Sequence, residues 1–247
     1  MITITLVYTG CKEDFLGELV LYTDLQRMKR ELLEQLVREG VVRSERVKKA
    51  FLRVPREEFV PPDQRRLAYL DHPLSIGCGQ TISAPHMVLL MTERLDARPG
   101  MKVLEVGAGS GYQAAILAEI VAPSDRPRSE WGHVYTIERI PELAEKARRN
   151  LEKTGYADRV TVIVGDGTKG YPPAAPYDRI IVTAAAPRIP RSLVEQLKVG
   201  GRMVIPVGDL YSQILLIVDK TKEGIKVKED VPCVFVPLIG EEGWPED

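Results

Sequence analysis

The chain has 247 residues, with 34 lysines and arginines against 35 aspartates and glutamates, and 44% of its residues are hydrophobic. This length allows one α/β domain with a sizeable core. The balanced charge and the lack of an apolar run near 18 residues argue against nucleic acid and membrane partners. The three cysteines form no CxxC pair, so neither a metal site nor a disulfide framework is expected. Residues 1–8 lack the features of a secretory signal, and we expect a cytoplasmic location.

The first 27 residues are interpreted as an N-terminal extension. Their alternation Ile2-Thr3-Ile4-Thr5 is compatible with an edge strand or with a homo-oligomer contact, and Met28 is also a plausible start of the chain. The remainder, residues 28–247, is predicted to be one domain with a helical and loop cap (28–98) and a Rossmann-like core (99–247).

Three helices are predicted in the cap from apolar spacing and from start and stop residues. They cover residues 24–39, the segment from Ser44 to just before Pro55, and a segment that begins at Pro85. The side chains expected to face the core are Leu25, Met28, Leu32 and Leu36 in the first helix and Met87, Leu90 and Met91 in the third.

From Lys102 onward, short apolar runs alternate with helical patterns, which is typical of a parallel sheet covered on both faces. Strands are predicted at Val103–Val106, Val134–Ile137, Val160–Val164, Ile180–Thr183 and Met203–Val207, and helices at Gly111–Ile120, Pro141–Lys153 and Pro190–Leu197. Two further strands without helices, Ile214–Val218 and Val231–Val236, predict an antiparallel C-terminal edge. The fold class is therefore α/β, doubly wound and mostly parallel. Residues 122–132, charged and rich in proline, are predicted to form a surface loop.

The strongest motif is VLEVGAGSGYQAAILA, residues 103–118. An apolar strand runs through Glu105 into Gly107, Gly109 and Gly111 and then into a helix, so the backbone can approach a ligand where a Cβ would clash. The spacing E-x-G-x-G-x-G differs from the G-x-G-x-x-G of dinucleotide binders. The ligand therefore need not carry a pyrophosphate.

Two later strands end in carboxylates that suit an adenosine. Glu138, at the tip of the second core strand, is placed to accept hydrogen bonds from ribose hydroxyls. Asp166, followed by Gly167, ends the third strand, where it can accept from an adenine amino group. Alone, each carboxylate is as well explained by a helix cap or a solvated loop. Three such strand ends in order favour a cofactor, and S-adenosylmethionine fits because its amino-acid tail has no phosphate.

The chain resembles the protein-L-isoaspartate (D-aspartate) O-methyltransferase family, a branch of the class I S-adenosylmethionine-dependent methyltransferases. The resemblance runs from about Met28 to Trp244 and includes a segment ahead of the core, DHPLSIGCGQTISAPHM at 71–87, whose TISAPHM stretch is specific to the family. The other matching segments are the glycine loop, Val164–Gly167, Ala184–Pro187, Leu197–Arg202 and Val236–Leu238.

The resemblance implies repair of damaged proteins. The enzyme would methylate the abnormal carboxylate of L-isoaspartyl residues in proteins and peptides, with activity on D-aspartyl residues left open. The methyl ester would collapse through a succinimide, and S-adenosyl-L-homocysteine would be the other product. Ser83 would be the active-site serine, and Val236, Pro237 and Leu238 would line the peptide cleft. The expected cofactor-binding residues are Gln80, Thr81, Ile82, Ser83, Glu105, Gly107, Gly109, Glu138, Arg139, Asp166 and Gly167.

The chemistry explains why so few polar groups are needed. A peptide carboxylate is ionised at neutral pH and needs no general base, and a neutral donor such as Ser83 can orient it without clamping it in the ground state. We expect residues 77–86 to form a loop over the cofactor that aims this carboxylate. Ser83 is equally well explained as the N-cap of the helix that begins at Pro85, and Cys78 is interpreted as a buried small side chain rather than a nucleophile.

Three other functions remain as alternatives. A class I methyltransferase acting on RNA or a small molecule is disfavoured by the neutral charge and the TISAPHM stretch, and an NAD-linked dehydrogenase by the glycine spacing. A binding module that senses an adenine nucleotide would bind the cofactor without an acceptor. Asn150 is the only asparagine in the chain, a composition that fits selection for heat resistance.

Overall fold

The computed structural model describes residues 11–246, and for residues 11–19 the helical backbone alone. The helices are α1 (Cys11–Arg38), α2 (Glu45–Arg53), α3 (Pro85–Leu95), α4 (Tyr112–Val121), α5 (Pro141–Lys153) and α6 (Arg191–Gln196). The strands are β1 (Leu74–Gly77), β2 (Gln80–Ile82), β3 (Lys102–Val106), β4 (His133–Glu138), β5 (Val160–Val164), β6 (Tyr177–Val182), β7 (Leu197–Gly208), β8 (Gln213–Thr221) and β9 (Gly224–Cys233). Within this described part of the chain, no helix is long and apolar enough to cross a bilayer.

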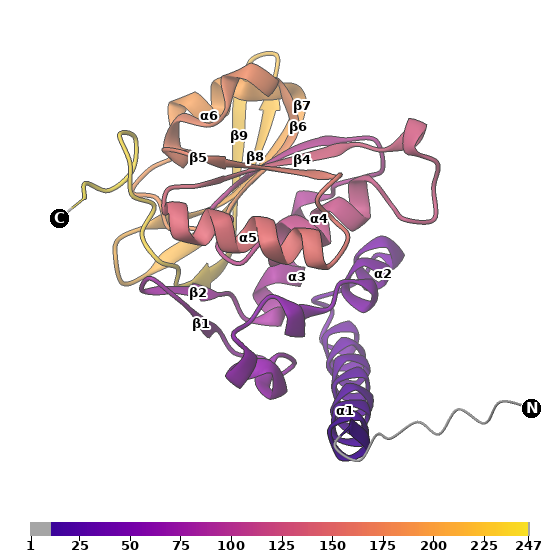
Figure 1. Cartoon of the computed structure of the whole chain (residues 1–247). Coiled ribbons are helices and arrows are strands. Elements are labelled where there is room, and N and C mark those ends of the chain that lie inside the picture. The colour runs from indigo at the N-terminus through magenta and orange to yellow at the C-terminus, as the bar shows by residue number, and fades with distance from the viewer. Residues whose placement is uncertain (1–10, 247) are drawn as a thin grey trace, which may run out of the picture.

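A seven-stranded sheet lies at the centre of the described residues, in the order β5-β4-β3-β6-β7-β8-β9 (Figure 1). The pairs from β5 to β7 are parallel, whereas β8 and β9 run antiparallel to their neighbours. The predicted fold class and its antiparallel edge are confirmed. The chain order reverses at β3, and such a switch point is where an open α/β sheet forms its ligand crevice.

Helices cover both faces of the sheet. α3, α4 and α5 pack on one face, where α4 is buried along its whole length because its sequence YQAAILAEIV presents apolar side chains all round. α6 packs on the other face together with Leu238 of the C-terminal segment. The strand ends beyond β3, β4, β5 and β6 are left open between the two layers.

Two predicted elements differ from the structure. α1 begins at Cys11 instead of residue 24 and crosses the expected boundary at residues 27 and 28 without a break; the alternation Ile2–Thr5 lies outside the described residues. β9 occupies 224–233 instead of 231–236. The apolar pattern missed it because β9 is an edge strand whose side chains, including Lys226 and Lys228, are mostly exposed.

The segment at 71–87 is more regular than the predicted loop. β1 and β2 form a separate two-stranded antiparallel hairpin, and Gly77, Cys78 and Gly79 make its turn with positive φ angles. Ile76 and Ile82 are buried beneath it. These apolar contacts hold the hairpin against the core and lead the chain directly into α3.

A buried ion-pair network ties the 122–132 loop to the core. The Glu119 carboxylate on α4 accepts from Arg53 of α2 at 2.6 Å, from Arg159 at 3.2 Å and from the Ser124 hydroxyl at 2.7 Å. Only 1% of the Glu119 side chain is exposed, against 8% for Arg159. Partial burial acts to raise the pKa of Glu119, but the hydrogen bonds from Arg53 and Ser124 outweigh it and hold the pKa below its ordinary value.

We expect Glu119→Ala to lower the free energy of unfolding by about 3 kcal/mol, because the buried Arg159 guanidinium then keeps only its longer contact, 3.7 Å, with the half-exposed Asp158 carboxylate. Denaturant titration followed by circular dichroism measures the change. Glu130→Gln is the matched control, since its ion pair with Arg126 is half exposed and such pairs contribute little. Equal effects of the two variants would contradict the network's role.

Candidate functional site

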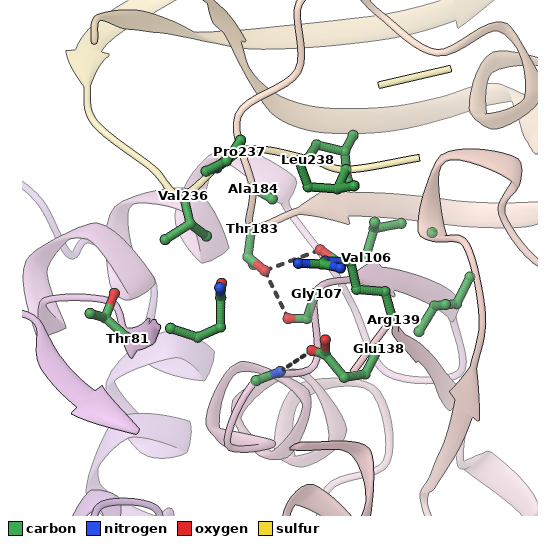
Figure 2. Close-up of a pocket in the computed structure, with 15 residues that line it drawn as sticks. Thr81, Val106, Gly107, Glu138, Arg139, Thr183, Ala184, Val236, Pro237 and Leu238 are labelled. Atoms are coloured by element: carbon green, nitrogen blue, oxygen red, sulfur yellow. Dashed lines mark hydrogen bonds between the residues drawn. The ribbon is translucent and has the colours of Figure 1, made fainter. Parts of the chain in front are cut away.

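Three neighbouring cavities follow one another along the carboxyl ends of the parallel strands. The first encloses about 560 Å³, including some space open to solvent, and lies over the ends of β3 and β4 beside the C-terminal segment (Figure 2). The second, here called the linking cavity, encloses about 430 Å³ between the glycine loop, α3 and α4. The third is an open groove of about 1,050 Å³ between the hairpin and residues 232–236. The first two volumes lie in the range of small-molecule sites.

The glycine loop forms the wall that the first two cavities share. Gly107 has φ +99°, and a Cβ there would collide with Thr183 Oγ1. The Thr183 hydroxyl instead donates to the carbonyl oxygen of Gly107 at 2.8 Å (Figure 2). Gly109 also has a positive φ, and its N–H donates to Glu138 Oε2 at 2.9 Å. Because Gly107 and Gly109 have no side chains, the backbone of the loop itself lies at the surface of the two cavities.

Glu138 lines the first cavity, as predicted for a ribose acceptor. Its Oε2 accepts from Gly109 and its Oε1 accepts from the N–H of Ile140 at 3.1 Å. The same carboxylate therefore orients itself and pins the glycine loop. Each oxygen has two lone pairs, so both retain an acceptor site for hydroxyls.

The Asp166 carboxylate is engaged elsewhere. Its Oδ1 accepts from the N–H and hydroxyl of Thr168 at 2.9 and 2.7 Å, and its Oδ2 accepts from the N–H of Glu241 at 2.9 Å. Partial burial acts to raise the pKa of Asp166, but these hydrogen bonds outweigh it and lower the pKa below its usual value. Asp166 does not line the three cavities, whereas the adjacent Gly167 lines the first. A role of Asp166 at the adenine stays a prediction.

Ser83 lies at the junction of the linking cavity and the groove. The side chain is half-buried, and its hydroxyl makes no hydrogen bond within the described residues. The N-cap alternative is wrong: α3 begins after Ala84, without a side-chain cap. Asp71 replaces the cap from fifteen positions upstream, because its Oδ1 accepts from the N–H of His86 at 2.9 Å. The Ser83 hydroxyl is thus free for a ligand.

His86, which lines the groove, forms an ion pair with Asp71 just outside it. His86 lines the groove, and its Nδ1 lies 3.0 Å from Asp71 Oδ1. This hydrogen bond raises the pKa of His86 above its ordinary value. His86 therefore adds an ion-paired side chain to the lining of the groove.

The C-terminal segment covers the first cavity from above (Figure 2). Pro237 forms a bridge with Ala185, and the Leu238 N–H donates to the carbonyl of Ala185 at 2.8 Å. Val236 lines both the first cavity and the groove, while Pro237 and Leu238 line the first cavity without reaching the groove. A substrate role for these three residues stays a prediction, and the geometry favours Val236.

The remaining predicted cofactor residues divide into two sets. Gln80, Thr81 and Arg139 line the first cavity, and Ile82 lines the linking cavity with Thr81. Glu105 lies behind the glycine loop, fully buried, and neither of its oxygens has a hydrogen-bond partner within the described residues. Its direct contact with a cofactor is untested by this geometry.

The structure differs from the sequence-based predictions at two residues, Thr183 and Cys78. Thr183 lines all three cavities, and its position just after β6 is the signal that could have found it, since strand ends build such sites. Cys78 is exposed in the hairpin turn, so the expectation of a buried side chain is wrong. Slight desolvation and the Glu142 carboxylate raise the pKa of its thiol, which disfavours a nucleophile. No metal-binding cluster occurs in residues 11–246 as described.

Comparison with known proteins decides the family. The family model for protein-L-isoaspartate (D-aspartate) O-methyltransferases matches residues 26–243. The chain belongs to this family. Protein-L-isoaspartate O-methyltransferases from Hyperthermus butylicus and Staphylothermus marinus are 70% and 63% identical to it over 219 residues, which is 88% of this chain and 91% and 96% of theirs. A crystal structure from Plasmodium falciparum assigned to this family, in complex with S-adenosyl-L-homocysteine, is 29% identical, covers 85% of this chain and 97% of its own, and superposes with a TM-score of 0.75.

The residues of this protein-L-isoaspartate O-methyltransferase fit its cofactor, S-adenosylmethionine. The bare backbone at Gly107 admits a close ligand, and the Glu138 carboxylate offers acceptors for a ribose. At Gly167 a Cβ would collide with Val106 Cγ1, so glycine lets this turn pack against Val106 at the edge of the first cavity. No step of this recognition requires a metal ligand.

Glu105 generates a pH-dependent prediction. Burial raises its pKa to about 8, and the Glu138 charge adds to the rise. The folded methyltransferase therefore keeps this proton between about pH 4.5 and 8 while the unfolded chain releases it, so this contribution to stability is lost as pH rises through that window.

We expect the unfolding free energy of the wild type to fall by a few kcal/mol, as an order of magnitude, between pH 5 and 8 because of Glu105. In Glu105→Gln this part of the fall should be absent. Denaturant titrations at several pH values measure it, with Glu152→Gln on the exposed face of α5 as control. A wild-type stability that does not fall relative to Glu105→Gln would contradict the buried, neutral carboxyl.

Proposed function

We propose that the chain transfers the methyl group of S-adenosylmethionine to the free carboxylate of L-isoaspartyl residues in damaged proteins, with Ser83 orienting that carboxylate. The observation that carries this proposal is the position of Ser83. Its unpaired hydroxyl lies where the linking cavity meets the groove, so it faces the path between a bound cofactor and an extended peptide. Isoaspartyl-containing proteins are the partners this geometry supports.

Bound in the first cavity, the cofactor supplies an electrophilic methyl group carried on a sulfonium. The chain has to hold a negative oxygen in line with that group and keep water away, because both charges fade as the reaction proceeds. Ser83 donates one hydrogen bond and leaves an oxygen lone pair free. Among residues 11–246, no Lys or Arg side chain lines the linking cavity or the groove, and His86 of the groove is paired with Asp71, so the acceptor carboxylate is not over-stabilised before transfer.

The two sides of the site carry different charges. Glu138 on the cofactor side holds Gly109 and is placed for a ribose, and Arg139 closes the same rim. On the acceptor side, Val236 and Met87 give the groove an apolar floor beside His86. An extended peptide with an extra methylene in its backbone fits such a groove better than a nucleic acid does, since the lining offers no run of cations.

Methyl transfer from labelled S-adenosylmethionine to three matched peptides tests the function. The peptides share one sequence and carry L-isoaspartate, D-aspartate or normal L-aspartate, and bulk RNA is a fourth acceptor. We expect strong labelling of the isoaspartyl peptide, weaker labelling of the D-aspartyl peptide and none of the normal one. Labelling of RNA, or equal labelling of all peptides, would overturn the proposal.

We expect Ser83→Ala to lower kcat for the isoaspartyl peptide roughly tenfold to a hundredfold, because the acceptor carboxylate loses its alignment. Since the hydroxyl makes no hydrogen bond within the described structure, the melting temperature should stay unchanged. Ser75→Ala is the control, as Ser75 is an exposed serine on β1 of the same hairpin. A normal kcat in Ser83→Ala would remove Ser83 from the mechanism.

We also infer that the protein is heat resistant and acts in the cytoplasm. Its relatives come from thermophiles, Asn150 is its only asparagine, and Glu119 anchors a buried ion-pair network of the kind that gains importance with temperature. Cys78 and Cys233 are free thiols, as a reducing compartment allows. We expect a Tm above about 90 °C by calorimetry, and a Tm of about 45–65 °C would contradict this inference.

A further inference from the structure

Arg56 is a fully buried cation beneath the hairpin. It follows α2 in a short 3-10 turn, Arg56–Glu58, and is 0% exposed. Buried arginines are rare unless paired, yet Arg56 has no ion pair with a carboxylate among residues 11–246 as described, and its Nη1 finds no partner there. A charge kept in the interior at this cost calls for a role other than stability.

The guanidinium binds main-chain carbonyls instead. Its Nε donates to the carbonyl oxygen of Ala68 at 2.8 Å, and its Nη2 donates to the carbonyl oxygen of Ser83 at 2.8 Å. The guanidinium Cζ of Arg56 lies 5.0 Å from the centre of the Tyr112 ring. One rigid group thus contacts the cap, the main chain of Ser83 and a residue that lines the linking cavity.

The third contact is informative because of where Tyr112 lies. Tyr112 is the first residue of α4, directly after the glycine loop, and it lines the linking cavity together with Ser83. Arg56 therefore sets the spacing between the two walls of that cavity. The carbonyl oxygen of Ser83 lies outside α3, and within the described structure Arg56 supplies the hydrogen bond that it accepts.

We infer that Arg56 is a positioning residue for methyl transfer, which holds the main chain of Ser83 so that its hydroxyl stays at the junction of the linking cavity and the groove. This inference rests on the proposed function. The cation contacts the carbonyl of Ser83 and not the acceptor, so it aligns the serine without clamping the substrate carboxylate. Lysine cannot replace it, because a single ammonium lacks the planar fork that spans two carbonyls and stacks on a ring.

Lys29 provides a matched control. It is also a buried cation of the cap, 1% exposed, whose Nζ donates to the carbonyl of Val54 at 2.9 Å and lies over the rings of Phe51 and Tyr69. It makes no contact with Ser83 or Tyr112. Replacing it perturbs the same region without touching the serine.

We expect Arg56→Lys to lower kcat for the isoaspartyl peptide roughly tenfold to a hundredfold, while the Kd for S-adenosyl-L-homocysteine, measured by calorimetry, changes less than about threefold. Lys29→Met should keep kcat within about twofold of the wild type. Arg56→Gln, which keeps an uncharged NH2 donor group, is the second variant should Arg56→Lys not fold, and the same fall in kcat is expected.

The double variant Arg56→Lys/Ser83→Ala decides whether Arg56 acts through the serine. We expect its kcat to be no lower than that of Ser83→Ala alone, because the arginine has no serine hydroxyl left to align. Additive losses, an unchanged kcat in a folded Arg56 variant, or an equal loss in Lys29→Met would overturn the inference. A wild type that does not methylate the isoaspartyl peptide would defeat the proposed function first, so the two failures are distinguishable.

Discussion

The contact between Gly107 and Thr183 is the constraint on which the site depends. It joins the ends of two neighbouring parallel strands, β3 and β6, because a residue without a side chain lets the threonine hydroxyl reach the carbonyl oxygens of Val106 and Gly107 at 3.1 and 2.8 Å. The threonine then lines all three cavities. One missing Cβ thereby keeps the cofactor side and the acceptor side continuous with each other.

The charges are distributed in a way that suits an attack of a carboxylate on a sulfonium. Acidic groups lie on the cofactor side, where Glu138 is fixed by two backbone N–H groups. The acceptor side presents the hydroxyls of Ser83 and Thr183, with the His86–Asp71 pair at its edge. The cations Arg56 and Lys29 are buried behind it and donate to carbonyl oxygens. Rigid placement of neutral groups does the work that an acid or a base does in other enzymes.

Much of this could be predicted from the sequence, because the ends of parallel strands meet at one edge of a sheet whatever the rest of the chain does. The positions of Glu138 and Gly107 at the first cavity follow from that rule. The sequence did not show that Asp71 would cap α3 or that Arg56 would reach Ser83, since both contacts join segments that only the tertiary fold brings together. The hairpin of β1 and β2 was not predicted because its strands are too short and too polar to show the alternation of apolar and polar residues that indicates a strand.

The hydrogen bonds of Asp166 have a consequence for the enzyme's own ageing. Asp166-Gly167 is the kind of dipeptide that isomerises most readily, by attack of the following main-chain nitrogen on the side-chain carbonyl carbon. Here both carboxylate oxygens are held, by Thr168 and by the N–H of Glu241. These hydrogen bonds lower the pKa of the carboxyl and so favour its ionised form, which is the poorer electrophile. The repair enzyme thereby protects its own Asp166-Gly167 peptide from the damage that it corrects in other proteins.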